Sequence, residues 1–147
     1  MLFRSINLSG GEKWSYDLKT LPRPKGKATQ VVVTTYDMPR KDSAPHDTAR
    51  DADGIVWFSD FQAPVIGRLD PKTGEVKEIP IPIQKPLDKG FPTGSLQIAL
   101  DQAGNVYAGT MGQAQVVRYE PKTGKMQTWT SPLWNKGDAR VTMIDPR

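Results

Sequence analysis

The same pattern of residues occurs twice in this chain of 147 residues, at an offset of 50 positions. Residues 51–58 read DADGIVWF where residues 101–108 read DQAGNVYA, and the stretch RLDPKTG at 68–74 returns as RYEPKTG at 118–124. The alignment runs without a gap over 27 positions, from 49–75 onto 99–125. Self-similarity at a fixed period indicates a repeat protein, in which each unit buries its apolar face only against a neighbour.

Each copy predicts four short strands separated by tight turns. Runs rich in β-branched and aromatic residues indicate strands, and Asp, Pro and Gly mark the turns between them. We expect strands at 46–50, 55–60, 65–69 and 75–80 in the first copy, and at 96–100, 105–110, 115–119 and 125–130 in the second. Four antiparallel strands in a unit of about 40–50 residues are what a β-propeller blade needs. A tandem of unrelated hairpins is the alternative interpretation.

The sequence therefore predicts an all-β fold, a partial β-propeller of four-stranded antiparallel blades. A closed propeller has about 4–8 blades, so we expect a piece of a longer protein or an association of several copies. We divide the chain into an N-terminal linker or part of a preceding blade (1–30), the outer strand of a preceding blade with its connection (31–44, the strand itself at 31–36), a first full blade (45–91), a second full blade (92–138) and the first strand of a truncated further blade (139–147).

Composition excludes several classes of function. The chain has no Cys, which excludes a disulfide scaffold, a thiol nucleophile and a Cys-ligated zinc site, and it has one His. Its 20 basic and 16 acidic residues are interspersed and give a net charge of +4, so nucleic acid is not indicated as a partner. No stretch approaches the roughly 20 apolar residues that span a membrane, and we expect no signal peptide. The basic stretch 19–27 predicts a solvated linker, with contact to a phosphate or an acidic partner as the alternative.

Several prominent residues are expected to serve folding. Trp57, Phe58 and Tyr107 are predicted to pack in the blades. Acids in tight turns accept backbone N–H bonds, which is the role predicted for Asp51, Asp53 and Asp101.

The first copy resembles the blade signature of the streptogramin B lyases, the virginiamycin B lyase family. Pro-His-Asp at 45–47, DADGIVWFSD at 51–60 and Ile-Gly-Arg at 66–68 are similar to the family's Pro-His-Gly, Asp-Gly-x-x-Trp-Phe-Thr-Glu and Ile-Gly-Arg. The resemblance covers about residues 31–145 and is weaker in the second copy. It implies a seven-bladed propeller in the intact protein. It also implies a magnesium-assisted elimination that opens a cyclic depsipeptide at its ester bond.

The resemblance implies site residues at the start of one strand and the end of the next. His46 matches the family's channel histidine and is expected to act as an acid or base, since imidazole exchanges protons near neutral pH. Asp60 matches the acid that acts with it and is expected to bind Mg²⁺, which prefers oxygen ligands. Their neighbours Asp47 and Phe61 are expected to contact the ligand.

The chain departs from the family pattern at these positions. Asp47 replaces a Gly, and Asp60 is one carbon shorter than Glu. In the second copy we align Thr93 and Thr110 with the His and the acid, so no base or metal ligand is expected there. The family draws histidines from more than one blade, whereas this chain has only His46. A loop histidine bonded to nearby backbone, and a polar strand end at Asp60, are therefore the alternative interpretations.

Two functions stay open. In the first, the chain is a segment of a streptogramin-lyase-like propeller that acts as a binding or scaffold module. Its partners are other blades of the same protein or further copies, and a small molecule or protein on the channel face. In the second, a longer chain or an oligomer completes a magnesium-dependent carbon–oxygen lyase. No other cofactor is expected. The family's exported members favour a periplasmic or secreted location, with the cytoplasm as the alternative.

Overall fold

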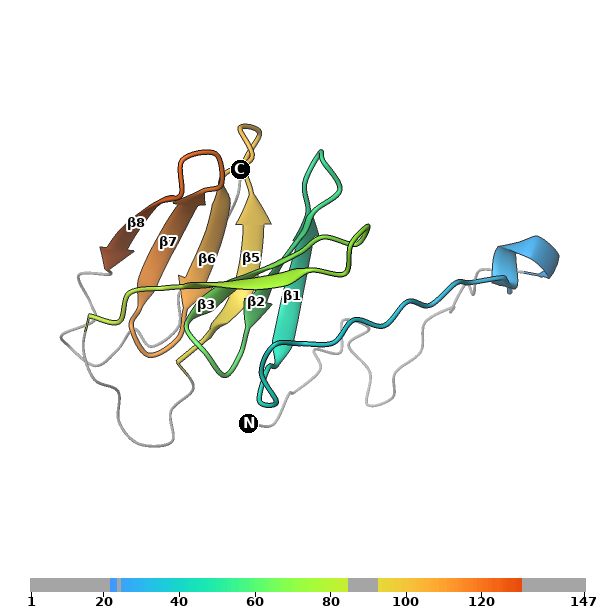
Figure 1. Ribbon diagram of the computed structural model, residues 1–147, viewed down its shortest axis with the longest axis horizontal. Helices are drawn as coiled ribbons and strands as arrows, with labels where there is room; N and C mark the ends of the chain where they lie inside the picture. The colour runs from blue at the N-terminus through green and yellow to red at the C-terminus, as the bar shows by residue number, and fades with distance from the viewer. Residues whose placement is uncertain (1–21, 24, 85–92, 131–147) are drawn as a thin grey trace, which may run out of the picture. The chain divides into compact units, whose positions relative to one another are not determined.

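The computed structural model describes residues 22–23, 25–84 and 93–130. The chain divides into two units, with the boundary between Thr34 and Thr35. The first unit contains a short 3-10 helix, η1 (Gly26–Thr29). The second unit contains two four-stranded antiparallel sheets in which each strand pairs with the next along the chain (Figure 1). The strands are β1 (Pro45–Arg50), β2 (Val56–Asp60), β3 (Val65–Leu69), β4 (Val76–Pro80), β5 (Ser95–Leu100), β6 (Val106–Thr110), β7 (Gln115–Glu120) and β8 (Lys125–Thr130).

The prediction of an all-β fold with two four-stranded blades is confirmed. Every strand predicted in the two copies is present, and its ends lie within one residue of those expected. The two sheets fall within the predicted blades at 45–91 and 92–138. The first strand of a further blade, expected within 139–147, and most of the N-terminal segment at 1–30 lie outside the described residues. Where the structure describes the chain, no helix is long and apolar enough to cross a membrane.

The strand predicted at 31–36 is not formed. No strand forms anywhere from 31 to 44, and Val31, Val32 and Val33 are 80%, 96% and 80% exposed. The prediction relied on the β-propensity of a Val- and Thr-rich run. That propensity reflects packing against neighbouring strands more than a preference of the backbone itself. The run has no such neighbour among the described residues, which explains the difference.

The repeated turns are built alike in the two sheets. Asp51 Oδ1 accepts the backbone N–H groups two and four residues further on, both at 3.0 Å, and Asp101 Oδ1 does the same at 2.9 Å. The second oxygen of each carboxylate accepts a hydrogen bond from an aromatic side chain. The donor is Trp57 Nε1 at 2.8 Å in the first sheet and the Tyr107 hydroxyl at 3.2 Å in the second. The turn role predicted for Asp51 and Asp101 is therefore confirmed.

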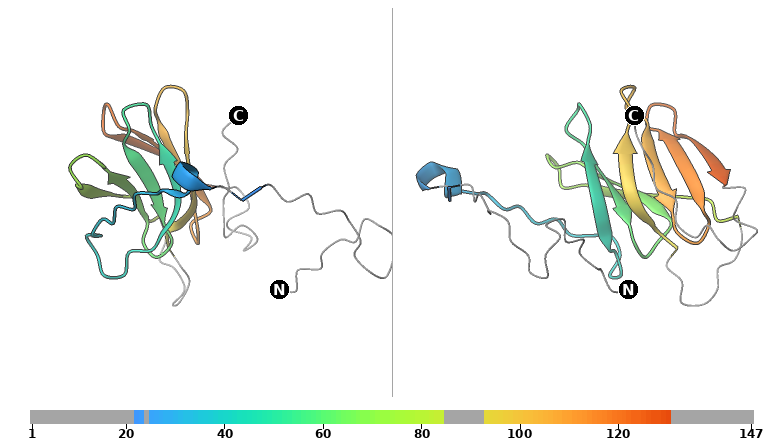
Figure 2. Two further views of the ribbon diagram at one scale, coloured as in Figure 1. Left: turned by 90° about the vertical axis from the view of Figure 1, so that its right-hand side faces the viewer. Right: turned by 180° about the vertical axis from the view of Figure 1, so that it is seen from behind.

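The two sheets lie side by side, with β5 next to β1 and β2 (Figures 1 and 2). The apolar core lies between them. The rings of Trp57 and Tyr119 lie 6.0 Å apart between their centres, so aromatic residues of both sheets are in contact. The packing predicted for Trp57 and Phe58 is confirmed, since they are 2% and 4% exposed. The buried members of the core cluster are Trp57, Ile66, Ile81, Ile98, Val106, Ala108 and Val117.

At one pair of facing positions, the larger residue lies on the second strand of the first blade but on the third strand of the second blade. Phe58 of β2 lies opposite Gly67 of β3, whereas the equivalent positions of β6 and β7 hold Ala108 and Val117. A Cβ atom added to Gly67 would overlap the Phe58 ring. Each blade thus fills this site with one large and one small residue, and the sequence of the first blade leaves no room for a second side chain.

We expect Gly67→Val to lower the free energy of unfolding by about 3 kcal/mol, because the new side chain would overlap the Phe58 ring. Adding Phe58→Ala copies the second blade and should recover at least about 1 kcal/mol of that loss. Urea denaturation of the wild type, the two single variants and the double variant gives the coupling free energy. Strictly additive effects would show that the two positions do not share space.

Candidate functional site

The candidate site lies where β1 begins and β2 ends. Pro45 pairs with Asp60, and the next pair is Thr48 with Phe58, so β1 has one residue more than β2 over this stretch. The extra residue makes a β-bulge that contains His46. Bulges turn side chains away from the regular alternation of a strand and are common beside binding sites.

His46 is held by the second blade and by a ring of its own blade. Its Nδ1 lies 2.8 Å from the carbonyl oxygen of Leu96 in β5. The imidazole also stacks on Phe61, with 6.1 Å between ring centres and 26° between planes. A carbonyl oxygen only accepts, so Nδ1 carries the proton and Nε2 of the neutral ring is an acceptor. The side chain is exposed and no described residue bonds Nε2, so this nitrogen is open to a ligand.

Asp47 joins the two blades. Its Oδ2 accepts the backbone N–H of Ile98 at 3.2 Å, and its Oδ1 accepts that of Thr48 at 2.9 Å. Its own N–H donates to Ser59 Oγ at 3.0 Å. Backbone donors thus use both carboxylate oxygens, and the residue fixes β1 against β5. The ligand contact expected for Asp47 stays a prediction.

Asp60 is buried and its carboxylate is fully bonded. It is 0% exposed. Its Oδ2 accepts from Arg40 Nη2 and from the backbone N–H of Ala44, both at 2.9 Å. Its Oδ1 accepts the backbone N–H groups of Gln62 and Ala63 at 2.9 and 2.8 Å. These bonds also fix the loop that carries the ring next to His46.

A magnesium ion does not fit this carboxylate as it is bonded. Two carboxylate oxygens offer about four acceptor positions, and four donors fill them at Asp60. Within the described ranges, no group of three or more His, Asp or Glu residues is arranged to hold a metal ion.

Arg40, which lies in none of the predicted motifs, bonds three acids at this end of the first blade. Its Nε donates to Glu78 Oε2 at 2.8 Å, and its Nη1 donates to Asp42 Oδ1 at 2.9 Å, beside the bond to Asp60. The hydrogen bond to Glu78 raises the pKa of Arg40 above its ordinary value; burial opposes the shift and the neighbouring carboxylates add to it. The sequence indicates Arg40 only indirectly: a buried acid at the end of a strand needs a compensating charge, but the sequence does not show which residue provides it.

The register of the second sheet corrects one alignment. Ser95 of β5 pairs with Thr110 of β6, which repeats the pairing at the start of β1. Leu96 therefore takes the place of His46, and the match predicted for Thr93 is wrong. The repeat keeps its offset of 50 through this strand because both sheets have the bulge with one extra residue. Thr110 holds the acid's position as predicted, so the second blade has neither a base nor an acid here.

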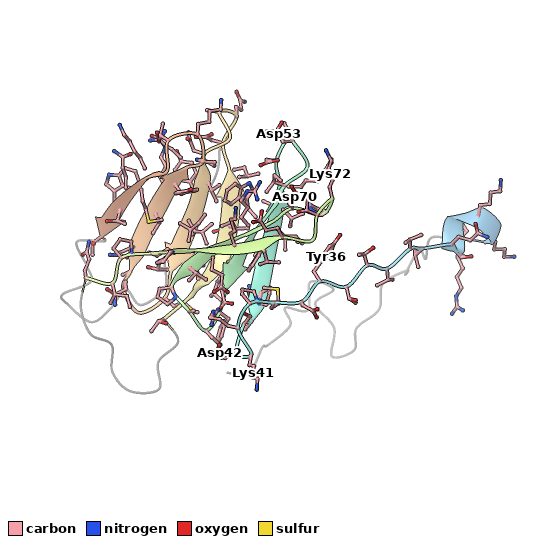
Figure 3. The ribbon with its side chains drawn as sticks, in the orientation of Figure 1. Tyr36, Lys41, Asp42, Asp53, Asp70 and Lys72 are labelled. Carbon is pink, nitrogen blue, oxygen red and sulfur yellow. The ribbon has the colours of Figure 1, made fainter. Side chains whose placement is uncertain are left out.

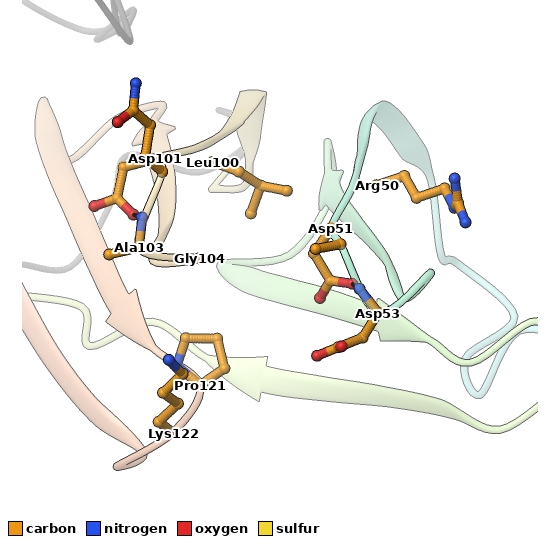
Figure 4. Close-up of a pocket in the computed structure, with 11 residues that line it drawn as sticks. Arg50, Asp51, Asp53, Leu100, Asp101, Ala103, Gly104, Pro121 and Lys122 are labelled. Atoms are coloured by element: carbon orange, nitrogen blue, oxygen red, sulfur yellow. Dashed lines mark hydrogen bonds between the residues drawn. The ribbon is translucent and has the colours of Figure 1, made fainter.

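An open cleft of about 420 Å³ lies at the opposite end of the strands (Figure 4). Figure 3 shows the separation, with Lys41 and Asp42 near one end of the first blade and Asp53 near the other. The turns β1–β2, β5–β6 and β7–β8 line the cleft, but the carboxylates of Asp51 and Asp101 are bonded within their own turns. These two carboxylates are therefore already used by the turns themselves.

Comparisons with known proteins identify the fold. No family model and no curated protein matches the sequence. Virginiamycin B lyase from Staphylococcus aureus is similar in structure, with a TM-score of 0.55 and 22% identity over 66% of this chain and 30% of the lyase. A catalytically inactive variant of the S. aureus enzyme, solved with quinupristin, gives 0.54 and 18% over 65% and 29%. A streptogramin B lyase structure gives 0.54 and 23% over 66% and 30%.

The fold is a partial β-propeller. The predicted likeness to streptogramin B lyases is confirmed for the fold, and the chain spans about 30% of the length of those lyases.

Asp101 in the β5–β6 turn gives the structure a pH-dependent element. Burial disfavours its charged form, but hydrogen bonds from Asn105, Tyr107 and the backbone of Ala103 outweigh burial and lower its pKa below the ordinary value. A depressed folded pKa means that the carboxylate stabilises the fold fully above its unfolded pKa of about 3.9. That contribution is lost as the pH falls through the folded pKa.

We therefore expect Asp101→Asn to reduce the free energy of unfolding clearly at neutral pH and much less below the folded pKa, where the wild-type side chain is itself neutral. Urea denaturation at the two pH values measures both effects. Asp53→Asn is the matched control, since it makes the same change at an exposed position of the other turn and should cost little at either pH. A loss of equal size at both pH values would contradict the ionic role of Asp101.

Proposed function

We propose that this chain is a segment of a propeller that acts as a binding module, with its ligand contacting His46 and Phe61 where β1 begins and β2 ends. The observation that carries the proposal is the fixed orientation of the His46 imidazole. The bond from Nδ1 to the Leu96 carbonyl and the stacking on Phe61 hold the ring, while Nε2 has no partner among the described residues.

The arrangement suits a ligand that combines a hydrogen-bond donor with an apolar or aromatic group. The donor would bond Nε2, and the apolar group would lie against the paired rings. Because the rings are already oriented, binding costs less side-chain entropy than it would with free rings. Asp47 supports the same surface by fixing β1 against β5, and a direct contact from it to the ligand is part of this proposal.

Quinupristin is the first probe to use. The structure of an inactive lyase variant with quinupristin has the same fold as the described blades. A chain that spans about 30% of a lyase holds only part of any complete site, so binding weaker than that of a whole propeller is expected.

A carbon–oxygen lyase is the second candidate, and one observation favours it. In the neutral tautomer set by Leu96, Nε2 of His46 can take a proton, as a base must. This chain has one His, so further groups would have to come from a longer chain or from other copies. Loss of intact quinupristin on chromatography, abolished in His46→Ala, would favour the lyase over the binding module.

We expect quinupristin to bind the wild-type chain and the variants His46→Ala and Phe61→Ala to bind it at least about tenfold more weakly, because each removes a central contact. Isothermal titration measures the affinities without relying on turnover. Thr48→Ala is the control, as it alters an exposed side chain of the same strand and should bind like the wild type. Wild-type affinity in both His46→Ala and Phe61→Ala would contradict the proposed contact surface.

A further inference from the structure

Residues 37–44, which we call the strap, precede β1 and bring one cation to the acids of the first blade. Arg40 of the strap donates to Asp60 at the end of β2, to Glu78 of β4 and to Asp42 of the strap itself, at 2.8–2.9 Å. The strap also contributes the backbone N–H of Ala44 to Asp60. One side chain thus connects the strap with the second and fourth strands of the sheet.

Burial makes this cation necessary. The side chains of Asp60 and Glu78 are 0% and 14% exposed, whereas that of Asp42 is 76% exposed. Two carboxylates removed from water near one another are costly unless a positive charge compensates them. The planar fork of a guanidinium presents several N–H donors in fixed directions, so it can serve two carboxylates at once in a way that a point charge cannot.

The second blade provides an internal comparison. Asp60 corresponds to Thr110, and Glu78, opposite Gly67, corresponds to Thr128, opposite Val117. Both acids are therefore replaced by neutral residues in the second blade. The hydroxyl of Thr110 is bonded within its own hairpin, where it accepts the backbone N–H of Gln115 at 3.1 Å. The acid pair is thus not a requirement of the fold, and it occurs in the blade where Arg40 is present.

We infer that the guanidinium of Arg40 is the resident cation of the Asp60–Glu78 pair and takes the place at which the family resemblance expects magnesium. A divalent ion would have to displace Arg40 or one of the backbone N–H groups on Asp60. Magnesium also keeps several waters in its octahedral shell, and Asp60 is wholly buried. The strap is therefore fixed by its own arginine, independently of the ligand proposed for His46.

The wild-type chain gives the first test. We expect the melting temperature in millimolar Mg²⁺ to equal that in sodium chloride of the same ionic strength. The reason is that Arg40 is already bonded to Asp60 and Glu78. A stabilisation by Mg²⁺ beyond the salt control that disappears in Asp60→Asn would overturn the inference, because it would make Asp60 a metal ligand in the native chain.

Removal of the cation gives the second test. Arg40→Gln should lower the melting temperature by at least about 4 °C, because the buried Asp60 and the partly buried Glu78 lose their partner. We expect Mg²⁺ to restore part of that loss and sodium chloride to restore none. The control is Arg118→Gln, which removes the arginine that bonds Glu120 on the second blade at 2.7 Å. It should show no response to Mg²⁺. A melting temperature for Arg40→Gln equal to that of the wild type would overturn the inference.

Should Arg40→Gln not fold, Arg40→Lys separates charge from geometry. Lysine keeps the positive charge but not the fork. The variant should therefore melt below the wild type and still show no response to Mg²⁺. A stabilisation of Arg40→Lys by Mg²⁺ beyond the salt control would show that the acids take a metal even with a cation present, and it would overturn the inference.

Discussion

A four-stranded sheet of five- and six-residue strands buries its apolar face only against another sheet, and the described structure depends on that constraint. Trp57 and Ile66 of the first blade and Val106 and Val117 of the second form one core between the sheets. Polar bonds then fix how the sheets meet. Asp47 of β1 accepts the N–H of Ile98 in β5, and Gly94 allows close approach, since a Cβ there would overlap the backbone of Asp60. The candidate site lies at this junction, so the packing that makes the fold also orients His46.

The two blades show how one backbone plan accepts different chemistry at the same positions. Large and small residues exchange places at Phe58 opposite Gly67 and at Ala108 opposite Val117. The charged residues also differ together between the two blades. In the first blade the buried Asp60 and the partly buried Glu78 share the strap's Arg40, whereas the second blade has threonines at the two acid positions. Neighbouring positions change together because a buried site must remain filled and electrically compensated.

The likeness to virginiamycin B lyase concerns the fold, and fold alone does not determine function. The proposed binding function rests instead on a histidine whose orientation is fixed by a carbonyl of the other blade. The inference about Arg40 concerns a different part of the same end of the first blade. In that inference Asp60 and Glu78 hold the strap, whereas the proposed ligand contacts the ring of His46. Binding at His46 can therefore fail without affecting the role of Arg40, and the reverse also holds.

The sequence by itself determined the repeat, the eight strands to within one residue, the turn acids Asp51 and Asp101 and the likeness of the blade to streptogramin B lyases. These features follow from local patterns, because alternation, turn residues and period are properties of neighbouring residues. Only the tertiary structure decided which partners the polar side chains meet. The bond from His46 to Leu96 spans 50 residues and that from Arg40 to Glu78 spans 38. Within the part of the chain that the structure describes, the run at 31–36 has no neighbouring strand of the kind that its composition favours. Such outcomes depend on which distant segments come together, and local pattern carries no information about that.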